Sequence, residues 1–163
     1  MTENWKDIKG FEGRYQVSDL GRVKSLPFMQ RYLLRNGREA YRRTAEMILR
    51  PQVGRHGYVL VSLHLDNQRV ARSVHSLVAE AFIEGQGETV NHKNGNKADN
   101  RADNLEWLSY TDNHIHAVYL GLNKQAVRVV HPKTGQEFPS MAEAARLTGL
   151  GSKYIARNFR RVR

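Results

Sequence analysis

The stretch from Thr89 to Ala117, TVNHKNGNKADNRADNLEWLSYTDNHIHA, constrains the fold of this chain more than any other. The first predicted strand, Glu88 to His92, is short and partly β-branched, and Asn94-Gly95 is a strong turn signal. Leu105 to Leu108 alternates apolar and polar residues, as a half-buried strand does. The stretch therefore predicts two strands joined by a polar loop.

A short helix is predicted after the second strand, capped by Thr111 or Asp112. One face of this helix carries Ile115, Val118 and Tyr119. His92 ends the first strand, Asn104 opens the second strand twelve residues later, and Asn113 lies nine residues further on. We expect these three side chains to meet on one side of a ββα unit. A His-x₁₁-Asn spacing alone is common and an Asn-rich loop is usually only a turn, so the prediction depends on all three elements agreeing.

These residues resemble the HNH endonucleases of the ββα-metal type, and specifically the homing endonucleases carried by phages. The resemblance is carried by Asn91-His92, Asn94-Gly95-Asn96, Asn104-Leu105-Glu106-Trp107 and Asn113. It implies that His92 is the catalytic base, that Asn91 and Asn113 hold a metal, and that Asn104 braces the loop and orients His92. Many relatives have aspartate at the position of Asn91, and some have histidine at that of Asn113.

The chemistry of phosphodiester cleavage fits these residue types. A histidine with an ordinary pKa near 6.5 is largely neutral at physiological pH and can deprotonate a water. A divalent metal stabilises the charged transition state and the leaving oxygen. Two carboxamide oxygens suit a hard cation, so we expect one Mg²⁺ or Mn²⁺ per active site. Two neutral ligands hold a cation weakly, and we expect the scissile phosphate to complete its shell.

Three other histidines are candidates by residue type alone. His75 lies in a predicted amphipathic helix, and we interpret it as a structural histidine with satisfied hydrogen bonds. His114 and His116 follow Asn113 on its helix. His116 is spaced to approach the face of Asn113, but a solvated or phosphate-contacting histidine is the favoured interpretation of both.

The charge of the chain indicates a polyanionic partner. The formal net charge is +10 and the pI about 10.1. Residues 31–72 contain nine arginines and three acids, and residues 124–163 contain nine basic residues and two acids. We expect double-stranded DNA, bound by a monomer. An RNA-binding protein is disfavoured because no aromatic-lined sheet motif is present.

The N-terminal part reads as antiparallel β structure. Residues 1–26 resemble the N-terminal modular repeat of phage HNH enzymes, with a hairpin formed by 15–18 and 22–25. Residues 27–41 are weakly patterned and are expected to be a mobile insertion with a turn at Asn36-Gly37. Further strands are predicted at 45–51, 58–65 and 69–74, the last two joined across 66–68, followed by a helix at 74–82 with Leu77, Val78, Ala81 and Phe82 buried. The expected DNA contacts in this part and the loop are Arg50, Arg55, Arg69, Arg72, Lys93, Lys97 and Arg101.

The C-terminal part predicts a helix-turn-helix. Strands at 126–130 and 136–138 precede a helix that Ser140 caps, with Glu143 completing a capping box. After a glycine turn, Ser152 is expected to cap a second helix, 153–160. The part resembles a C-terminal module of phage homing nucleases, and the resemblance is carried by Phe138-Pro139-Ser140, Glu143-Ala144-Ala145 and Ile155. Its second helix is expected to expose Lys153, Tyr154, Arg157 and Asn158 to the major groove of DNA. The chain stops soon after it, where relatives commonly continue into a further strand.

Together these features predict an α+β fold: an extended, multi-module chain with N-terminal β hairpins, a central ββα-metal motif and a C-terminal helix-turn-helix. The expected domains are 1–50, a β DNA-binding module; 51–121, the nuclease domain; and 122–163, the helix-turn-helix module. The expected function is site-preferring hydrolysis of double-stranded DNA, and the alternative is a catalytically inactive DNA-binding regulator or packaging accessory. The sequence contains no run of eighteen apolar residues, so we expect no membrane span. The absence of cysteine fits a reducing cytoplasm.

Overall fold

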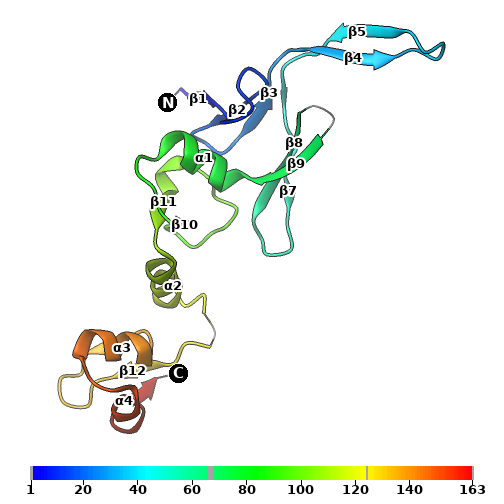
Figure 1. Cartoon of the computed structure of the whole chain (residues 1–163). Coiled ribbons are helices and arrows are strands. Elements are labelled where there is room, and N and C mark those ends of the chain that lie inside the picture. Colours follow the sequence, from blue (N-terminus) through cyan, green and yellow to red (C-terminus); the bar gives the residue numbers. More distant parts are fainter. Residues whose placement is uncertain (1, 66–67, 124, 163) are drawn as a thin grey trace. The chain divides into compact units, whose positions relative to one another are not determined.

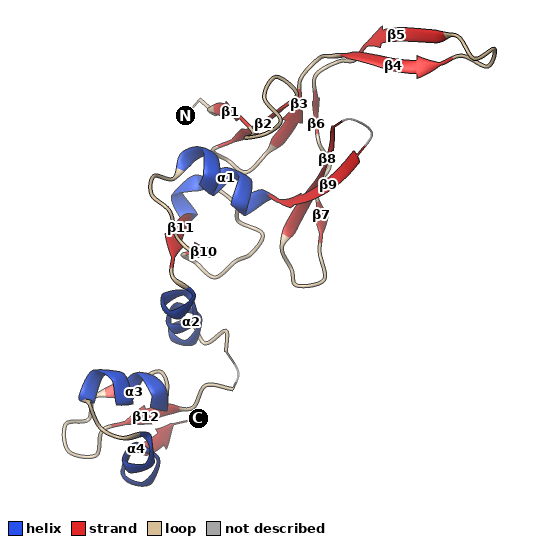
Figure 2. Cartoon of the chain, viewed as in Figure 1, coloured by secondary structure: helices blue, strands red, loops and turns tan. Residues whose placement is uncertain are grey.

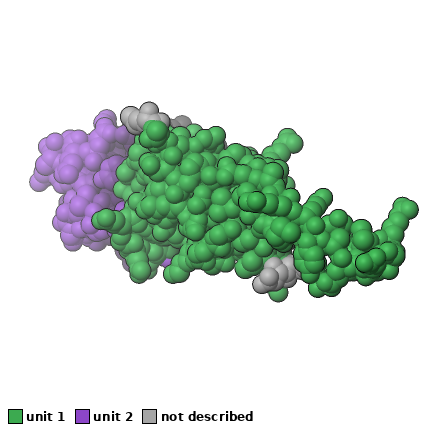
Figure 3. Space-filling view, turned by 90° about the horizontal axis from the view of Figure 1, so that it is seen from above, with its two compact units in different colours: residues 1–107 green, residues 108–163 purple. Residues whose placement is uncertain are grey.

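The computed structural model describes residues 2–65, 68–123 and 125–162, and the chain divides into two compact units, 1–107 and 108–163 (Figure 3). Small antiparallel sheets and α-helices make up both units, which confirms the predicted α+β class (Figure 2). The extended arrangement and the domain boundaries at 50 and 121 stay predictions. In the described ranges no helix combines the length and hydropathy needed to cross a bilayer.

The N-terminal sheet has the strand order β1-β2-β3-β6. Its strands are β1 (Trp5–Asp7), β2 (Tyr15–Ser18), β3 (Val23–Ser25) and β6 (Met47–Ile48). Tyr15 and Val17 point into the core while Gln16 between them is only partly buried, so the alternation of β2 matches its pleat. The predicted hairpin of residues 15–25 is confirmed, with Val17 paired to Val23.

Residues 27–41 differ from the expected mobile insertion, because they belong to a regular β hairpin. Strands β4 (Met29–Leu33) and β5 (Glu39–Arg43) pair along their whole length, and Figure 1 shows them extending away from the other strands of their unit. The predicted turn at Asn36-Gly37 is present between them. Nearly every side chain of the hairpin is exposed, so no core-facing alternation marks it in the sequence.

A second sheet and a helix complete the first unit before the active-site region. Strands β7 (Gln52–Val53), β8 (Val59–Leu65) and β9 (Gln68–Ser73) form a sheet, as predicted for the last two. The expected turn at residues 66 and 67 lies outside the described residues. Helix α1 (Val74–Phe82) has its predicted bounds. Leu77 and Val78 are buried as expected, whereas Ala81 and Phe82 are only partly buried.

One hydrophobic core joins the elements of the first unit. Val17 of β2, Leu63 of β8 and Leu77 of α1 belong to it, together with Leu105 of β11 (Leu105–Leu108). Burial of these side chains couples the N-terminal sheet to the hairpin of β10 (Thr89–His92) and β11. The strands on either side of the predicted loop, β10 and β11, are therefore fixed by packing against this core.

The second unit begins with α2 (Tyr110–Tyr119). A three-stranded sheet follows, in the order β13-β12-β14, with β12 (Arg128–Val130), β13 (Glu137–Phe138) and β14 (Arg160–Val162). Helices α3 (Met141–Thr148) and α4 (Ser152–Asn158) pack on a core of Val129, Phe138, Ala144, Ile155 and Phe159. The helix pair matches the predicted helix-turn-helix.

Two predictions about the N-terminal caps of α2 and α4 are wrong. Ser109, not Thr111 or Asp112, caps α2, because its hydroxyl accepts from the Asp112 amide. Gly151, not Ser152, is the N-cap of α4, which has no side-chain cap.

Helix α4 also ends earlier than the predicted residue 160, at Asn158. Residues 160–162, the first of which was assigned to the helix, form β14 against β12. The further strand expected of relatives is therefore present. The helix ends before Phe159 because the Phe159 side chain is buried in the core, at 5% exposure.

Candidate active site

The loop between β10 and β11, residues 93–104, is held by its own hydrogen bonds; we call it the site loop. The Lys93 amide donates to the carbonyl of Asn104 at 2.8 Å, and the Gly95 amide donates to the carbonyl of His92 at 2.8 Å. These bonds close the loop at its base. They fix the direction in which His92 leaves the end of β10.

Asn104 has the contacts expected of a residue that braces this loop. Its Oδ1 accepts from the Asn94 amide at 3.1 Å, and its Nδ2 donates to the carbonyl of Asp99 at 2.8 Å. Asn104 is buried at 6% exposure, so water competes little for these bonds. The site loop is thus tied across its width by one carboxamide.

Among the described residues the Asn104 side chain makes no hydrogen bond to the His92 ring, so the predicted orienting of His92 by Asn104 stays a prediction. The partner of the His92 ring is instead Asn100, whose Oδ1 lies 3.2 Å from His92 Nε2 and can only accept a hydrogen bond. The reason is the path of the loop: eight residues after His92 the chain returns beside the ring, whereas the Asn104 side chain turns toward Asn94.

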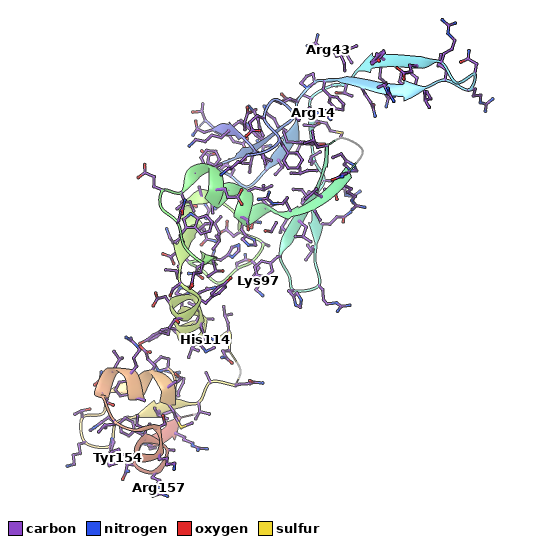
Figure 4. All side chains as sticks on the ribbon, viewed as in Figure 1. Arg14, Arg43, Lys97, His114, Tyr154 and Arg157 are labelled. Carbon is purple, nitrogen blue, oxygen red and sulfur yellow. The ribbon has the colours of Figure 1, made fainter. Side chains whose placement is uncertain are left out.

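His92 lies in a cluster of rings. Its centroid is 5.1 Å from that of His75 and 6.1 Å from that of Tyr58, and Tyr58 and His75 lie 4.9 Å apart. Lys97 places its ammonium 4.4 Å from the centre of the Tyr58 ring. The Lys97 label in Figure 4 marks this place on the site loop.

Burial keeps both imidazoles neutral. Desolvation lowers the pKa of His92, although the hydrogen bond to Asn100 opposes this shift. Desolvation and the nearby His92 lower the pKa of His75 to about 4. At neutral pH, His92 therefore carries a lone pair and can accept a proton.

His75 differs from the expected satisfied histidine. It packs against Tyr58 and His92, yet its Nδ1 is buried without a hydrogen-bond partner in the described part of the chain. An unpaired buried nitrogen is costly, so the His75 ring is held beside His92 by packing against the neighbouring rings and not by a hydrogen bond at Nδ1.

Asn91 is oriented by a carboxylate. Its Nδ2 donates to Glu106 Oε1 at 2.7 Å, from β10 to β11, so the remaining ligating atom of the Asn91 side chain is Oδ1. Within the described ranges no group of three or more His, Cys, Asp or Glu side chains could hold a metal. An oriented carboxamide oxygen fits a hard cation, as expected from the resemblance.

The structure brings together Asn91, His92 and Asn104 in the first unit. Asn113 is half-buried in the first turn of α2, in the second unit, beside the exposed His114 labelled in Figure 4. Its convergence with the other three stays a prediction.

Several of the predicted DNA-contacting cations are engaged within the protein. Lys97 Nζ donates to the carbonyl of His56 at 3.0 Å, and Lys93 Nζ to that of Asp103 at 3.0 Å. Ion pairs join Arg101 to Asp99 and Arg72 to Glu80, while Arg69 bonds Ser62. Arg50 and Arg55 are exposed, and α4 exposes Lys153, Tyr154 and Arg157, the last two marked in Figure 4.

Two protein-family models match this chain. Residues 3–64 match the NUMOD4 motif, and residues 72–115, which include the site loop, match the HNH endonuclease family. The chain contains an HNH endonuclease domain. This HNH domain comprises α1, β10, the site loop, β11 and the start of α2.

The relatives agree with this assignment. An uncharacterized HNH endonuclease, L247 of Acanthamoeba polyphaga mimivirus, is 35% identical over 94% of the chain and 37% of its own length. The DNA endonuclease I-HmuI of Bacillus phage SP01 is 37% identical over 64% of the chain and 52% of its own length. The chain thus spans about half or less of the curated relatives it matches.

A solved structure resembles the whole chain. The structure titled "DNA binding and cleavage by the HNH homing endonuclease I-HmuI" matches with a TM-score of 0.56 and 28% identity, and the match covers 98% of each chain. The predicted resemblance to phage HNH homing endonucleases is confirmed.

Two interactions of this site were not predicted from the sequence: the contact of Asn100 with His92 and the orienting of Asn91 by Glu106. Asn100 is one of several polar residues in the site loop and carries no periodic signal. Glu106 alternates with apolar residues in β11, so its polarity alone indicates a solvent-facing strand position. Its place opposite Asn91 follows from strand pairing, which spacing alone does not give.

Proposed function

We propose that this protein hydrolyses phosphodiester bonds in double-stranded DNA at preferred sequences, using His92 as general base and one divalent metal. The observation that carries the proposal is a buried imidazole held by a hydrogen bond to Asn100, next in the chain to a carboxamide whose nitrogen donates to Glu106. The HNH match and the homologue named as a DNA endonuclease support it.

His92 performs the proton transfer in this scheme. The ring accepts a proton from the attacking water, and burial favours the neutral form that this step needs. Asn91 and Asn113 would hold Mg²⁺ or Mn²⁺ through their carboxamide oxygens. Bound there, the metal supplies Lewis-acid stabilisation of the phosphate and the leaving 3′ oxygen. Asn104 keeps the site loop rigid while this happens.

DNA contact is assigned to the exposed basic residues. Arg50 and Arg55 in the first unit and Arg157 on α4 have side chains exposed to solvent, and the chain carries a net charge of +10. Phosphate contacts supply affinity, and α4 supplies base contacts in a major groove. We propose that a monomer binds and that cleavage leaves 5′-phosphate and 3′-hydroxyl ends.

A plasmid-nicking assay tests this function. Supercoiled DNA is incubated with the protein and Mg²⁺, Mn²⁺ or a chelator, and the nicked product is quantified. We expect metal-dependent nicking, and His92→Ala should lose it by roughly 10²- to 10⁴-fold while binding DNA normally. The exposed His64→Ala is the matched control and should cut like the wild type. Wild-type binding without any nicking would support the inactive DNA-binding protein instead.

A further inference from the structure

We propose that Asn100 is a positioning residue that sets the orientation and tautomer of His92, and that the β2–β3 turn holds Asn100 in place. Its catalytic consequence rests on the proposed function, whereas the geometry is a property of the folded protein alone. The first link is the 3.2 Å contact between Asn100 Oδ1 and His92 Nε2.

The orientation of the Asn100 carboxamide follows from its second hydrogen bond. Asn100 Nδ2 donates to the carbonyl of Ala98 at 3.1 Å, and a carbonyl oxygen can only accept. The nitrogen therefore faces Ala98 and Oδ1 faces His92. Because Oδ1 also only accepts, His92 Nε2 must carry the hydrogen, and Nδ1 must carry the lone pair.

Burial makes this arrangement selective. His92 is 5% exposed and Asn100 is 6% exposed, so water cannot readily replace either partner. The other tautomer would set two acceptors against each other in a buried place, which is unfavourable. The free nitrogen of His92 is therefore always Nδ1, and this is the atom available to take a proton from water.

The second link runs from the site loop to the N-terminal sheet. The Ala102 amide donates to the carbonyl of Asp19, in the β2–β3 turn, at 2.8 Å. Gly21 of the same turn has φ +79° and lies against Asn100 so closely that a Cβ there would be 2.9 Å from both Asn100 Cβ and its carbonyl oxygen. Only glycine satisfies both the backbone conformation and the contact.

The turn is held by its own hydrogen bonds. Its Ser18 is fully buried, and the Ser18 hydroxyl accepts from the Arg22 amide at 3.0 Å. Asn4 donates to the Asp19 carboxylate from the exposed side. The N-terminal module that matches the NUMOD4 motif therefore supports the catalytic geometry of the HNH domain as well as any DNA contact of its own.

The tautomer is measured by long-range ¹H–¹⁵N NMR of the protein without DNA. We expect the His92 signals of the wild type to show the Nε2–H form. Asn100→Ala should lose this preference, and Asn100→Asp, which still offers an acceptor, should keep it. Asn36→Ala, an exposed asparagine in the β4–β5 turn, is the control and should leave the His92 signals unchanged. A wild-type Nδ1–H signal would overturn the proposal.

Cleavage kinetics test the consequence. Asn100→Ala should lower kcat by roughly 10- to 100-fold with KM for DNA unchanged, and Asn100→Asp should recover at least part of that loss. An unchanged kcat in Asn100→Ala would overturn the positioning role. If the wild type fails to cut, the proposed function fails while the NMR result still decides the tautomer.

Gly21→Ala tests the turn against Gly10→Ala. Gly10 has almost the same φ, +80°, but nothing lies within 4 Å of an added Cβ. Both variants carry the same backbone strain, so only the contact with Asn100 distinguishes them. We expect Gly21→Ala alone to shift the His92 signals and lower kcat. Asn4→Ala removes only the side-chain hydrogen bond to Asp19 and serves as the test if Gly21→Ala does not fold. We expect it to shift the same His92 signals by a smaller amount. Unchanged His92 signals in both Gly21→Ala and Asn4→Ala would overturn this link.

Discussion

Two residues of the candidate active site are each oriented by a hydrogen-bond partner. Asn91 is turned by Glu106, and His92 is turned by Asn100. Each partner leaves one atom of the functional side chain available, Oδ1 of Asn91 and Nδ1 of His92. Orientation by such partners commonly changes metal affinity or activity by about 10- to 100-fold.

Glu106 is expected to control the metal through Asn91. In Glu106→Ala the Asn91 amide loses its 2.7 Å acceptor and is free to turn its nitrogen toward the metal position. The Mg²⁺ concentration that gives half-maximal cleavage should rise roughly 10- to 100-fold. Glu106→Gln keeps an acceptor oxygen and is the matched control, with a much smaller rise. Identical metal dependence in Glu106→Ala and the wild type would contradict this role.

His75 is expected to make the stability of the protein depend on pH. Its pKa is about 4 in the folded protein against an ordinary 6.5, so the unfolded chain binds the proton more readily between these values. The favourable contribution is present above pH 6.5 and is lost as the pH falls through 6.5 to about 4. The full loss is below about 3.4 kcal/mol, from 1.36 kcal/mol per pKa unit, because the His75 ring is only partly buried and solvent screens part of the effect.

His75→Phe retains a ring beside Tyr58 and removes the titration. Denaturant unfolding of both proteins across this pH range should show a steeper loss of stability in the wild type than in the variant. Parallel curves would show that His75 does not titrate differently on folding.

At the scale of elements, helix termini depend on single side chains. The Ser140 hydroxyl accepts from the Glu143 amide at 3.1 Å and caps α3, whereas Ser152 opens α4 without a cap bond. The Glu143 carboxylate pairs with Arg146 at 2.7 Å. The serine half of the predicted capping box is confirmed, whereas the Glu143 carboxylate pairs with Arg146 in the following turn.

Ser140→Ala should destabilise α3 by about 1 kcal/mol, because one amide of its first turn loses its acceptor. Ser152→Ala in α4 is the natural comparison and should change stability by less than about 0.5 kcal/mol. Native-state hydrogen exchange of the α3 and α4 amides measures both changes separately. Equal effects of the two substitutions would mean that the Ser140 cap contributes nothing specific.

At the scale of the whole molecule, the net charge of +10 should dominate DNA affinity. The logarithm of the binding constant should fall linearly with the logarithm of salt concentration. Arg157→Ala should reduce the magnitude of that slope by about 0.9, the value for one lost phosphate contact. Arg157→Lys keeps the charge and should keep the slope. Fluorescence anisotropy with a labelled duplex measures both, and an unchanged slope in Arg157→Ala would remove this residue from the interface.

The sequence alone determined the elements whose side chains alternate between core and solvent. The strands 15–18, 59–65 and 105–108 and the helix 74–82 were predicted because burial imposes a visible period on them. The β4–β5 hairpin and β14 were not, since exposed ribbons and short edge strands lack that period. The residue types of the HNH motif, and with them the family, were also readable from spacing.

Only the tertiary structure decided which side chains meet. The bonds from Asn100 to His92 and from Glu106 to Asn91, and the contact of Gly21 with Asn100, join residues 8, 15 and 79 positions apart. Such contacts depend on loop path, strand register and side-chain direction, none of which leaves a periodic trace in a single sequence. The sequence indicated the candidate chemistry through its residue types. The packing of the β2–β3 turn against the site loop positions Asn100, and in our proposal Asn100 leaves Nδ1 of His92 as the atom that accepts the proton.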